Sequence, residues 1–356
     1  MKITIITSPF HELPPIAIGA VEKLFYQLAG AWADAGHEVA FVCAGGGDDA
    51  RMRFVRLKKY ARTGSTWTDL IWDFIYSFKA ILFAPKADVL LCNTFWSPVF
   101  APLMRWKYKK LVYGVHRYPK RQFFLYPFVH RFICVSAAVA EPLKKQVAPH
   151  RVCIVTNPID TAVFKPESRQ IVKGRILYAG RIHPLKGLRC LSEACGRLFA
   201  AGLVKELVLV GPYERSKGGG GEEFVNELRA SAAGCLVKVT GAISDPMEFA
   251  KIERTAEVFV YPSEDVRGEA FGVAPLEAMA LGVPTIVSGL KCFDEFVRNG
   301  ENALKFRMGD RDGLIEKLQS FLGNESMRVR MGEAAARTAG GFSVDTVARC
   351  YLKEFG

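Results

Sequence analysis

Two series of short β-branched runs, separated by segments with helical patterning, constrain the fold of this 356-residue chain most strongly. The eleven runs are residues 3–7, 38–43, 89–92, 110–114, 131–135 and 152–155 in the first series, and 175–179, 206–210, 237–240, 258–261 and 284–287 in the second. Strands that alternate with helices of this length form parallel sheets covered by helices on both faces. We therefore predict an α/β protein with two doubly wound, Rossmann-like domains that bind ligands at the carboxyl ends of their strands.

A turn-forming segment at residues 157–166 separates the two series, because it contains Asn-Pro and ends in Pro. The chain also exceeds the length at which one hydrophobic core usually keeps growing. We expect an N-terminal domain at residues 1–160 and a C-terminal domain at residues 167–335. We further expect a C-terminal helix within residues 336–356 that packs back toward the N-terminal domain.

Positive charge is concentrated in the first half of the chain. The net charge is +12, and residues 1–165 carry 22 Lys and Arg against 11 Asp and Glu. In residues 104–110 and 118–126 these cations are interleaved with aromatic and aliphatic residues. This mixture favours an anionic membrane surface over nucleic acid as a partner, because apolar groups enter the headgroup boundary while Lys and Arg meet anionic lipid. A solvated basic face in front of core aromatics is the structural alternative.

No apolar run of about 18 residues is free of charge, so we predict no transmembrane helix. The first residues lack the features of a signal peptide and have the pattern of a buried strand. We expect a cytoplasmic protein, either free or peripheral at the inner face of the cell membrane. The nine cysteines include no C-x-x-C pair and are expected to be buried free thiols rather than metal ligands.

The segment at residues 268–284 carries the clearest chemical signal. A Gly-containing turn leads to Pro275 in a first helical turn, and a Gly and a Pro end the helix. The free N–H groups and dipole of such a helix N-terminus favour a phosphate. Glu277, in or near the first turn, is placed to reach ribose hydroxyls, and Glu269 to reach a sugar. Alternatively, Glu277 only complements the helix dipole and Glu269 is a solvated loop acid.

Glu269 and Glu277 have seven residues between them, within the sequence G-E-A-F-G-V-A-P-L-E-A-M-A-L-G-V-P. This resembles the E-x7-E signature of glycosyltransferase family 4, the retaining GT-B glycosyltransferases also called group 1. The resemblance implies a GT-B fold, with two Rossmann-like domains facing each other across a cleft. It also implies that Glu277 binds ribose and that Glu269 is catalytic, with Phe271, Gly272 and Val273 holding the phosphate side of the donor.

Three further stretches match the family in the expected order. The segment with Gly180, Arg181 and Lys186 resembles the family's strand-loop motif. The resemblance implies that Arg181 and Lys186 clamp the diphosphate. Cations placed there stabilise the charge that develops on the departing phosphate. Gly211 and Ile243 fall in the loops that, by this resemblance, bracket the nucleotide base.

The N-terminal half matches the family less closely. A loop at residues 14–22 is similar to the family's Gly-Gly loop, but Ala20 replaces the second Gly, so Gly19 alone carries the donor-binding role. His116 falls where family members place a His near the donor sugar, which makes it a catalytic candidate in the acceptor-binding domain. The segment at residues 288–296 departs from the family's common Gly-x-Pro-Glu form.

Two other signals are set aside. Asp310-Arg311-Asp312 matches the D-x-D of metal-dependent enzymes, but it precedes a helical pattern, so we predict that Asp310 is an N-cap. No divalent metal or other cofactor is therefore expected. The pair of Glu269 and Glu277 also suggests a glycosidase, but such enzymes need no phosphate clamp.

The resemblance implies a retaining, metal-independent glycosyltransferase. It would move a hexose from a nucleotide diphosphate sugar, with a UDP-hexose favoured and UDP-glucose as the default, to a saccharide or lipid-linked acceptor in cell-surface polysaccharide biosynthesis. Two alternatives are a UDP-sugar 2-epimerase of the same fold and a catalytically silent nucleotide-sugar-binding scaffold.

Overall fold

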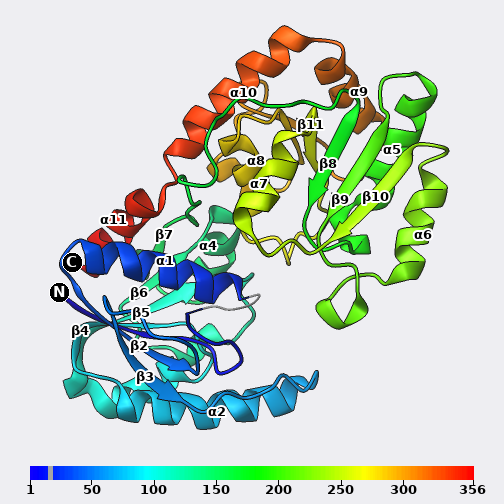
Figure 1. Cartoon of the computed structure of the whole chain (residues 1–356). Helices are drawn as coiled ribbons and strands as arrows, with labels where there is room; N and C mark the ends of the chain where they lie inside the picture. Colours follow the sequence, from blue (N-terminus) through cyan, green and yellow to red (C-terminus); the bar gives the residue numbers. More distant parts are fainter. Residues whose placement is uncertain (15–18) are drawn as a thin grey trace. The chain divides into compact units, whose positions relative to one another are not determined.

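The computed structural model describes residues 1–14 and 19–356, and it divides them into two compact units (Figure 1). Unit 1 consists of residues 1–158 and 344–356, and unit 2 consists of residues 159–343. The chain thus leaves unit 1 within the predicted turn segment and returns to it for its last helix. The expected domain boundary between residues 335 and 336 falls inside α10 (Glu325–Gly340), which stays with unit 2.

Unit 1 contains a seven-stranded sheet in the order β3-β2-β1-β4-β5-β6-β7, and every neighbouring pair is parallel. Its strands are β1 (Lys2–Ile6), β2 (Glu38–Ala44), β3 (Arg53–Leu57), β4 (Ala87–Cys92), β5 (Tyr108–Val115), β6 (Arg131–Cys134) and β7 (Val152–Ile154). Its helices are α1 (Ala20–Asp34), α2 (Thr66–Phe83), α3 (Ser97–Phe100), α4 (Ala137–Lys144) and α11 (Val344–Phe355), with shorter 3-10 turns η1 (Ala101–Lys107), η2 (Phe123–Leu125) and η3 (Pro149–Arg151).

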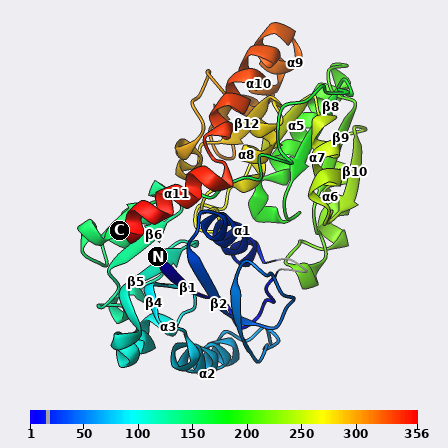
Figure 2. The same cartoon turned by 60° about the vertical axis from the view of Figure 1, so that its left-hand side comes forward.

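The C-terminal helix α11 packs on α1 within unit 1. Trp32 of α1 is fully buried, and its indole N–H donates to the carbonyl oxygen of Ala348 at 3.0 Å. The rings of Tyr351 and Phe355 lie 5.9 and 5.4 Å from the Trp32 ring. Figures 1 and 2 show α1 and α11 along one face of the sheet and α2 along the opposite face.

Unit 2 contains a six-stranded parallel sheet in the order β10-β9-β8-β11-β12-β13. Its strands are β8 (Arg175–Ala179), β9 (Glu206–Val210), β10 (Leu236–Gly241), β11 (Val258–Tyr261), β12 (Thr285–Ser288) and β13 (Leu304–Phe306). Its helices are α5 (Leu188–Ala200), α6 (Glu222–Ser231), α7 (Pro246–Arg254), α8 (Val273–Ala280), α9 (Arg311–Leu322) and α10, with 3-10 turns η4 (Pro184–Lys186), η5 (Arg215–Lys217) and η6 (Lys291–Glu295).

The predicted α/β architecture with two doubly wound parallel sheets is confirmed. All eleven predicted strands are present, with ends that differ by at most two residues. Two strands, β3 and β13, were not predicted. β3 is an edge strand with two exposed Arg residues, and β13 has only three residues, so neither forms the long buried run that marks a parallel strand.

No helix within residues 1–14 and 19–356 is both long and apolar enough to cross a bilayer.

Candidate functional site

Helix α8 begins at Val273, directly after Gly272. Gly272 has φ +87°, and a Cβ at this position would lie 2.5 Å from Cε1 of Phe293, so the turn into the helix requires glycine. Pro275 is the third helical residue, where the backbone N–H that proline lacks has no partner within the helix. The predicted helix is confirmed, and its first turn presents N–H groups suited to an anion.

Glu277 is the fifth residue of α8, so it lies near the first turn rather than in it. No acidic residue occupies the first turn of this helix. Because the dipole effect is confined to the first turn, complementing it does not account for Glu277. The side chain is half-buried, on the same helix whose N-terminus is suited to a phosphate.

Lys186 and Glu269, which are 83 residues apart in the sequence, form a buried ion pair. The ammonium group of Lys186 lies 2.7 Å from Oε2 of Glu269, and the two side chains are only 7% and 10% exposed. The hydroxyl of Tyr261 donates to the same oxygen at 3.1 Å, and Asp265 lies 3.8 Å from the ammonium group. Glu269 is therefore not a solvated loop acid. An ammonium has three donors, and among the described residues Lys186 uses one in this bond, which leaves donors for a further oxygen.

Arg181 lies in the loop after β8 and is exposed. Its carbonyl oxygen accepts a hydrogen bond from the Tyr178 hydroxyl at 2.9 Å, and the Tyr178 ring stacks on Tyr261, with ring centroids 5.4 Å apart. Within the part of the chain that the structure describes, the Arg181 guanidinium forms no ion pair, and it makes no hydrogen bond to Lys186 or Glu269. It remains available for an anionic ligand.

Glycines occupy the carboxyl ends of three adjacent strands. Gly180 follows β8, Gly211 follows β9, and Gly241 ends β10. The backbones here are packed so closely that a Cβ on Gly211 would overlap the carbonyl oxygen of Gly180. This edge lies beside the point between β8 and β11 where the strand order reverses, which is where open α/β sheets bind ligands. The half-exposed Ile243 follows β10 on the same side of the sheet.

Phe271 belongs to the hydrophobic core. Its side chain is 2% exposed, and its ring lies 5.3 Å from Phe296 and 6.3 Å from Phe342. The side chain thus packs in an aromatic cluster, and only the backbone of Phe271 can serve a ligand. The sequence could not show this, because a Phe within a motif can either pack in the core or contact a ligand, and the sequence is the same in both cases.

The structure also brings a second carboxyl group close to Glu277. Glu253, near the end of α7, is fully buried, and neither of its carboxyl oxygens has a hydrogen-bond partner within residues 1–14 and 19–356. Burial raises the pKa of Glu253 well above its usual value, and the negative charge of Glu277 raises it further. Burial thus favours the protonated, neutral form of Glu253 in the folded protein. No sequence signal marked it, since a Glu near a helix end is usually solvated.

Replacing Glu253 by Met is expected to raise the free energy of unfolding at pH 8 by about 1 to 3 kcal/mol, because an unsatisfied buried polar group is removed. As the pH rises, the carboxyl group of Glu253 loses its proton in the unfolded chain at a lower pH than in the folded protein, because its pKa is raised by folding. The wild type therefore loses stability as the pH rises above the ordinary pKa of Glu. The gain should therefore be smaller at pH 4.5 than at pH 8. Urea unfolding at both pH values measures it, with the exposed Glu248→Met on the same helix as control; an equal gain at both pH values would contradict the assignment.

His116 directly follows β5 in unit 1. Its Nε2 is buried without a hydrogen-bond partner among the described residues, and its ring meets the edge of Phe25 at 5.2 Å. Burial, with a smaller contribution from Arg117, lowers the pKa of His116 to about 4. The imidazole is therefore neutral at physiological pH and keeps an unused ring nitrogen at the carboxyl edge of the unit 1 sheet.

A titration of His116 followed by NMR should have its midpoint near pH 4, because the folded protein resists charging the buried ring. The unfolded chain takes up this proton near pH 6.5, so the stability that His116 contributes is complete above pH 6.5 and is lost as the pH falls toward 4. His116→Gln should make the acid loss of stability shallower over this window. A midpoint near 6.5 would show a solvated ring and contradict the buried placement.

Gly19 is the N-cap of α1, with φ −142°. A Cβ at Gly19 would lie 2.7 Å from Oε2 of Glu22, whose buried side chain folds back over it. The predicted loop preceding Gly19 falls largely on residues 15–18, outside the described residues.

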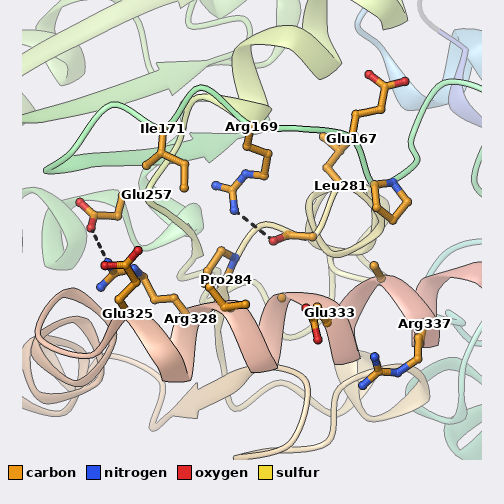
Figure 3. A pocket seen from close by; sticks show the side chains of 15 residues that line it. Glu167, Arg169, Ile171, Glu257, Leu281, Pro284, Glu325, Arg328, Glu333 and Arg337 are labelled. Atoms are coloured by element: carbon orange, nitrogen blue, oxygen red, sulfur yellow. Dashed lines mark hydrogen bonds and ion pairs between the residues drawn. The ribbon is translucent and has the colours of Figure 1, made fainter.

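A cavity of about 600 Å³ in unit 2 lies at the other end of α8, and none of the predicted site residues lines it (Figure 3). It is bordered by Leu281, Pro284 and one side of α10. The Arg169 guanidinium in its wall donates to three carbonyl oxygens, including that of Gly282 at 3.1 Å, and Arg328 pairs with Glu257 at 3.2 Å. Arg169 thus ties the linker segment, and Arg328 ties α10, to the residues that precede β11.

Asp310 is the N-cap of α9. Its side chain accepts a hydrogen bond from the backbone N–H of Gly313 at 2.9 Å, so the N-cap prediction is confirmed.

Comparison with known families decides the identity of this arrangement. Residues 20–163 match the family model described as Glycosyltransferase Family 4, and residues 164–338 match the model described as Glycosyl transferases group 1. The two matches adjoin and together cover most of the chain. The chain belongs to the group 1 glycosyltransferases of family 4.

Curated relatives of this family-4 chain include a D-inositol 3-phosphate glycosyltransferase of a Nocardioides species, 28% identical over 56% of the chain and 47% of the relative. A phosphatidyl-myo-inositol mannosyltransferase of Mycolicibacterium smegmatis is 26% identical over 92% of the chain and 86% of the relative. One of the same name from Mycobacterium leprae is 30% identical over 51% of the chain and 46% of the relative. The matched regions span about half the length of the Nocardioides and M. leprae proteins.

Solved structures share the whole fold of this family-4 chain. Sucrose-phosphate synthase of Thermosynechococcus elongatus superposes with a TM-score of 0.81 at 19% identity, over 99% of this chain and 97% of the other. HepE of Anabaena, solved in complex with UDP, has a TM-score of 0.75 at 17% identity, over 99% of each chain. The predicted GT-B fold class is confirmed.

Proposed function

We propose that this protein transfers a hexose from a nucleotide diphosphate sugar to a saccharide or lipid-linked acceptor, with retention of anomeric configuration and without a divalent metal. The observation that carries the proposal is the buried pair of Lys186 and Glu269, at the point of the unit 2 sheet where the strand order reverses. A cation and a carboxylate placed together there match the two ends of the bond that breaks, a phosphate on one side and a sugar with its hydroxyls on the other.

The donor is held by groups along the same edge of unit 2. The α8 N-terminus, with Gly272 and Val273, accepts the diphosphate, and Glu277 on the same helix accepts hydrogen bonds from the ribose hydroxyls. Gly180 and Gly211 leave the backbone open to the ligand, and Ile243 lies beside the base. Gly180 and Gly211 have no side chains that could bind the nucleotide base, which agrees with recognition of the base by backbone groups.

In the reaction, the acceptor hydroxyl attacks the anomeric carbon on the face that the diphosphate leaves. The bond from the anomeric carbon to the acceptor oxygen forms as the bond to the phosphate oxygen breaks, and the acceptor proton passes to a phosphate oxygen. Arg181 and Lys186 stabilise the negative charge on the departing diphosphate. Glu269 keeps Lys186 in place and binds sugar hydroxyls. The neutral His116 of unit 1 offers its unused Nε2 to an acceptor hydroxyl.

UDP-glucose is the first donor to test, since HepE of Anabaena is solved both with UDP and with UDP-glucose. The curated relatives named as mannosyltransferases make a mannose donor the comparison. For the acceptor, a relative named for phosphatidyl-myo-inositol and another named for D-inositol 3-phosphate support testing lipid-linked and soluble acceptors together. A role in cell-surface polysaccharide assembly at the inner face of the membrane follows if the lipid-linked acceptor is used.

Calorimetry of UDP and of UDP-glucose, each with and without EDTA, tests the donor site. We expect saturable binding that EDTA does not change, and NMR of the product to show the donor's anomeric configuration. An inverted product would contradict the same-face mechanism, and binding abolished by EDTA would contradict metal independence.

A further inference from the structure

Helix α2 presents an apolar face to solvent. Trp67, Ile71, Phe74, Phe78 and Leu82 follow one another at steps of four, three, four and four residues, which places them on one side of the helix. All five are exposed, from 42% for Leu82 to 80% for Trp67. A surface helix normally turns such a stripe toward the core and its polar residues toward water.

Two polar residues of α2, Asp73 and Ser77, point the other way and are buried. The Ser77 hydroxyl donates to Oδ1 of Asp73 at 2.9 Å and also lies 3.1 Å from the Thr94 hydroxyl, while the backbone N–H of Phe95 donates to Oδ2 of Asp73 at 2.8 Å. These satisfied, buried hydrogen bonds fix the rotation of α2 about its axis. The apolar face is thus held outward by the fold and is not a result of loose packing.

The exposed surface continues beyond α2. The ring of Phe100 contacts Phe74 and Phe78 with centroids 4.9 and 5.6 Å apart, and η1 follows directly with exposed Leu103 and Trp106. Lys107, at the end of η1, donates to the carbonyl oxygens of Leu82 and Ala84, which ties η1 to the end of α2. We define the apolar patch as the exposed large side chains of these two elements: Trp67, Ile71, Phe74, Phe78, Leu82, Phe83, Leu103 and Trp106.

Cations accompany this patch. Residues 66–128 contain nine Lys and Arg against three Asp and no Glu. Of the three acids, Asp73 is buried and Asp88 pairs with Lys109 at 2.7 Å. Lys79 is exposed on α2 beside the apolar stripe, and Arg105 is exposed on η1 between Leu103 and Trp106.

We propose that the apolar patch docks this protein on a bilayer that contains anionic lipid, so that α2 lies in the plane of the headgroups. Aromatic and aliphatic side chains enter the boundary, while Lys79 and Arg105 meet lipid phosphates. A second copy of the chain fits less well, because a symmetric contact would bring the two cationic rims against each other. The inference rests on the proposed function, since it names the surface from which a lipid-linked acceptor is reached.

The docking surface overlaps only in part with the one that the sequence suggested, since residues 104–110 contribute the exposed Trp106. Residues 118–126 were expected to present aromatic side chains outward, but Phe123 and Tyr126 are buried in the core, and the Tyr126 hydroxyl bonds to the carbonyl oxygen of Phe95. Only Phe124 of this aromatic trio is exposed. For residues 118–126 the expectation is wrong, because a basic, aromatic segment does not reveal which of its rings pack in the core.

The test is co-sedimentation with vesicles of phosphatidylcholine and phosphatidylglycerol, and with vesicles of phosphatidylcholine alone. The patch variant combines Trp67→Ser, Ile71→Ser and Trp106→Ser, which are highly exposed and lose little internal packing. The control variant combines Phe199→Ser, Met247→Ser and Val329→Ser, three exposed apolar residues of unit 2. UDP affinity and light scattering are measured on the same samples.

We expect the wild type to bind the anionic vesicles, and to bind them more weakly in added salt. The patch variant should partition at least about 10-fold less, since three apolar groups no longer enter the boundary, while the control variant and all UDP affinities stay unchanged. The proposal would be overturned if the wild type did not bind anionic vesicles, or if the patch and control variants lost vesicle binding equally. A wild-type dimer that becomes monomeric in the patch variant without any vesicle binding would also overturn it. If the wild type did not bind UDP, that result would count against the proposed function rather than against the docking surface.

Discussion

Replacing Lys186 by Met should lower kcat by about 100- to 1000-fold, the loss usual when one preorganised group that stabilises transition-state charge is removed. UDP affinity should fall much less, because the charge on the departing diphosphate grows only as the sugar bond breaks. Steady-state kinetics with calorimetry of UDP on the same protein separates the two effects. Equal loss in affinity and turnover would indicate uniform diphosphate binding instead.

A structural role for Lys186 must be distinguished from a catalytic one, because its partner Glu269 would be left buried and unpaired. Breaking such a pair typically costs about 3 to 5 kcal/mol of stability. The double variant Lys186→Met with Glu269→Gln removes both charges, so it should recover the thermal stability of the wild type but not its turnover. Recovery of both would make the pair purely structural. Arg181→Ala offers a second comparison: this side chain is exposed and makes no ion pair with the described residues, so kcat should fall without loss of stability.

Replacing Glu277 by Ala should weaken UDP binding by about 1.5 to 3 kcal/mol, which is roughly 10- to 150-fold, because the ribose loses a charge-assisted hydrogen-bond acceptor. Glu316→Ala, an exposed Glu on α9, is the matched control and should leave UDP affinity unchanged. Calorimetry with UDP measures both variants. Wild-type affinity in a folded Glu277→Ala protein would remove the ribose assignment.

Much of the fold could be predicted because parallel strands buried on both faces appear in the sequence as continuous β-branched runs. The Gly-containing turn and the helix at residues 268–284 could also be predicted from the sequence. Glycine and proline precede the helix-forming residues, and a second glycine and proline follow them, which are the usual signals for the start and end of a helix. β3 was not predicted because it is an edge strand whose exposed Arg residues interrupt the β-branched pattern. β13 was not predicted because three residues are too few to form a recognisable apolar run.

The candidate site could be predicted only in part. The roles of Lys186 and Glu269 followed from resemblance, and their contact depends on loops that only the folded sheet brings together. Glu253 was missed because burial of a carboxyl group near a helix end has no local signature. The outward face of α2 was missed for a related reason: a helix with apolar residues on several sides does not show which side is buried until partners such as those of Asp73 are known.

Incubation of the protein with radiolabelled UDP-glucose, other UDP-hexoses and a mannose donor, with and without lipid-linked and soluble acceptors, tests the central claim most directly. The account predicts that one donor gives label on an acceptor, with release of an equal amount of nucleoside diphosphate. It also predicts that this transfer is lost in the Lys186→Met variant. A new nucleotide sugar formed without any acceptor would instead show an epimerase. Donor binding with no conversion under any condition would show a silent binding protein, and either result would contradict the account.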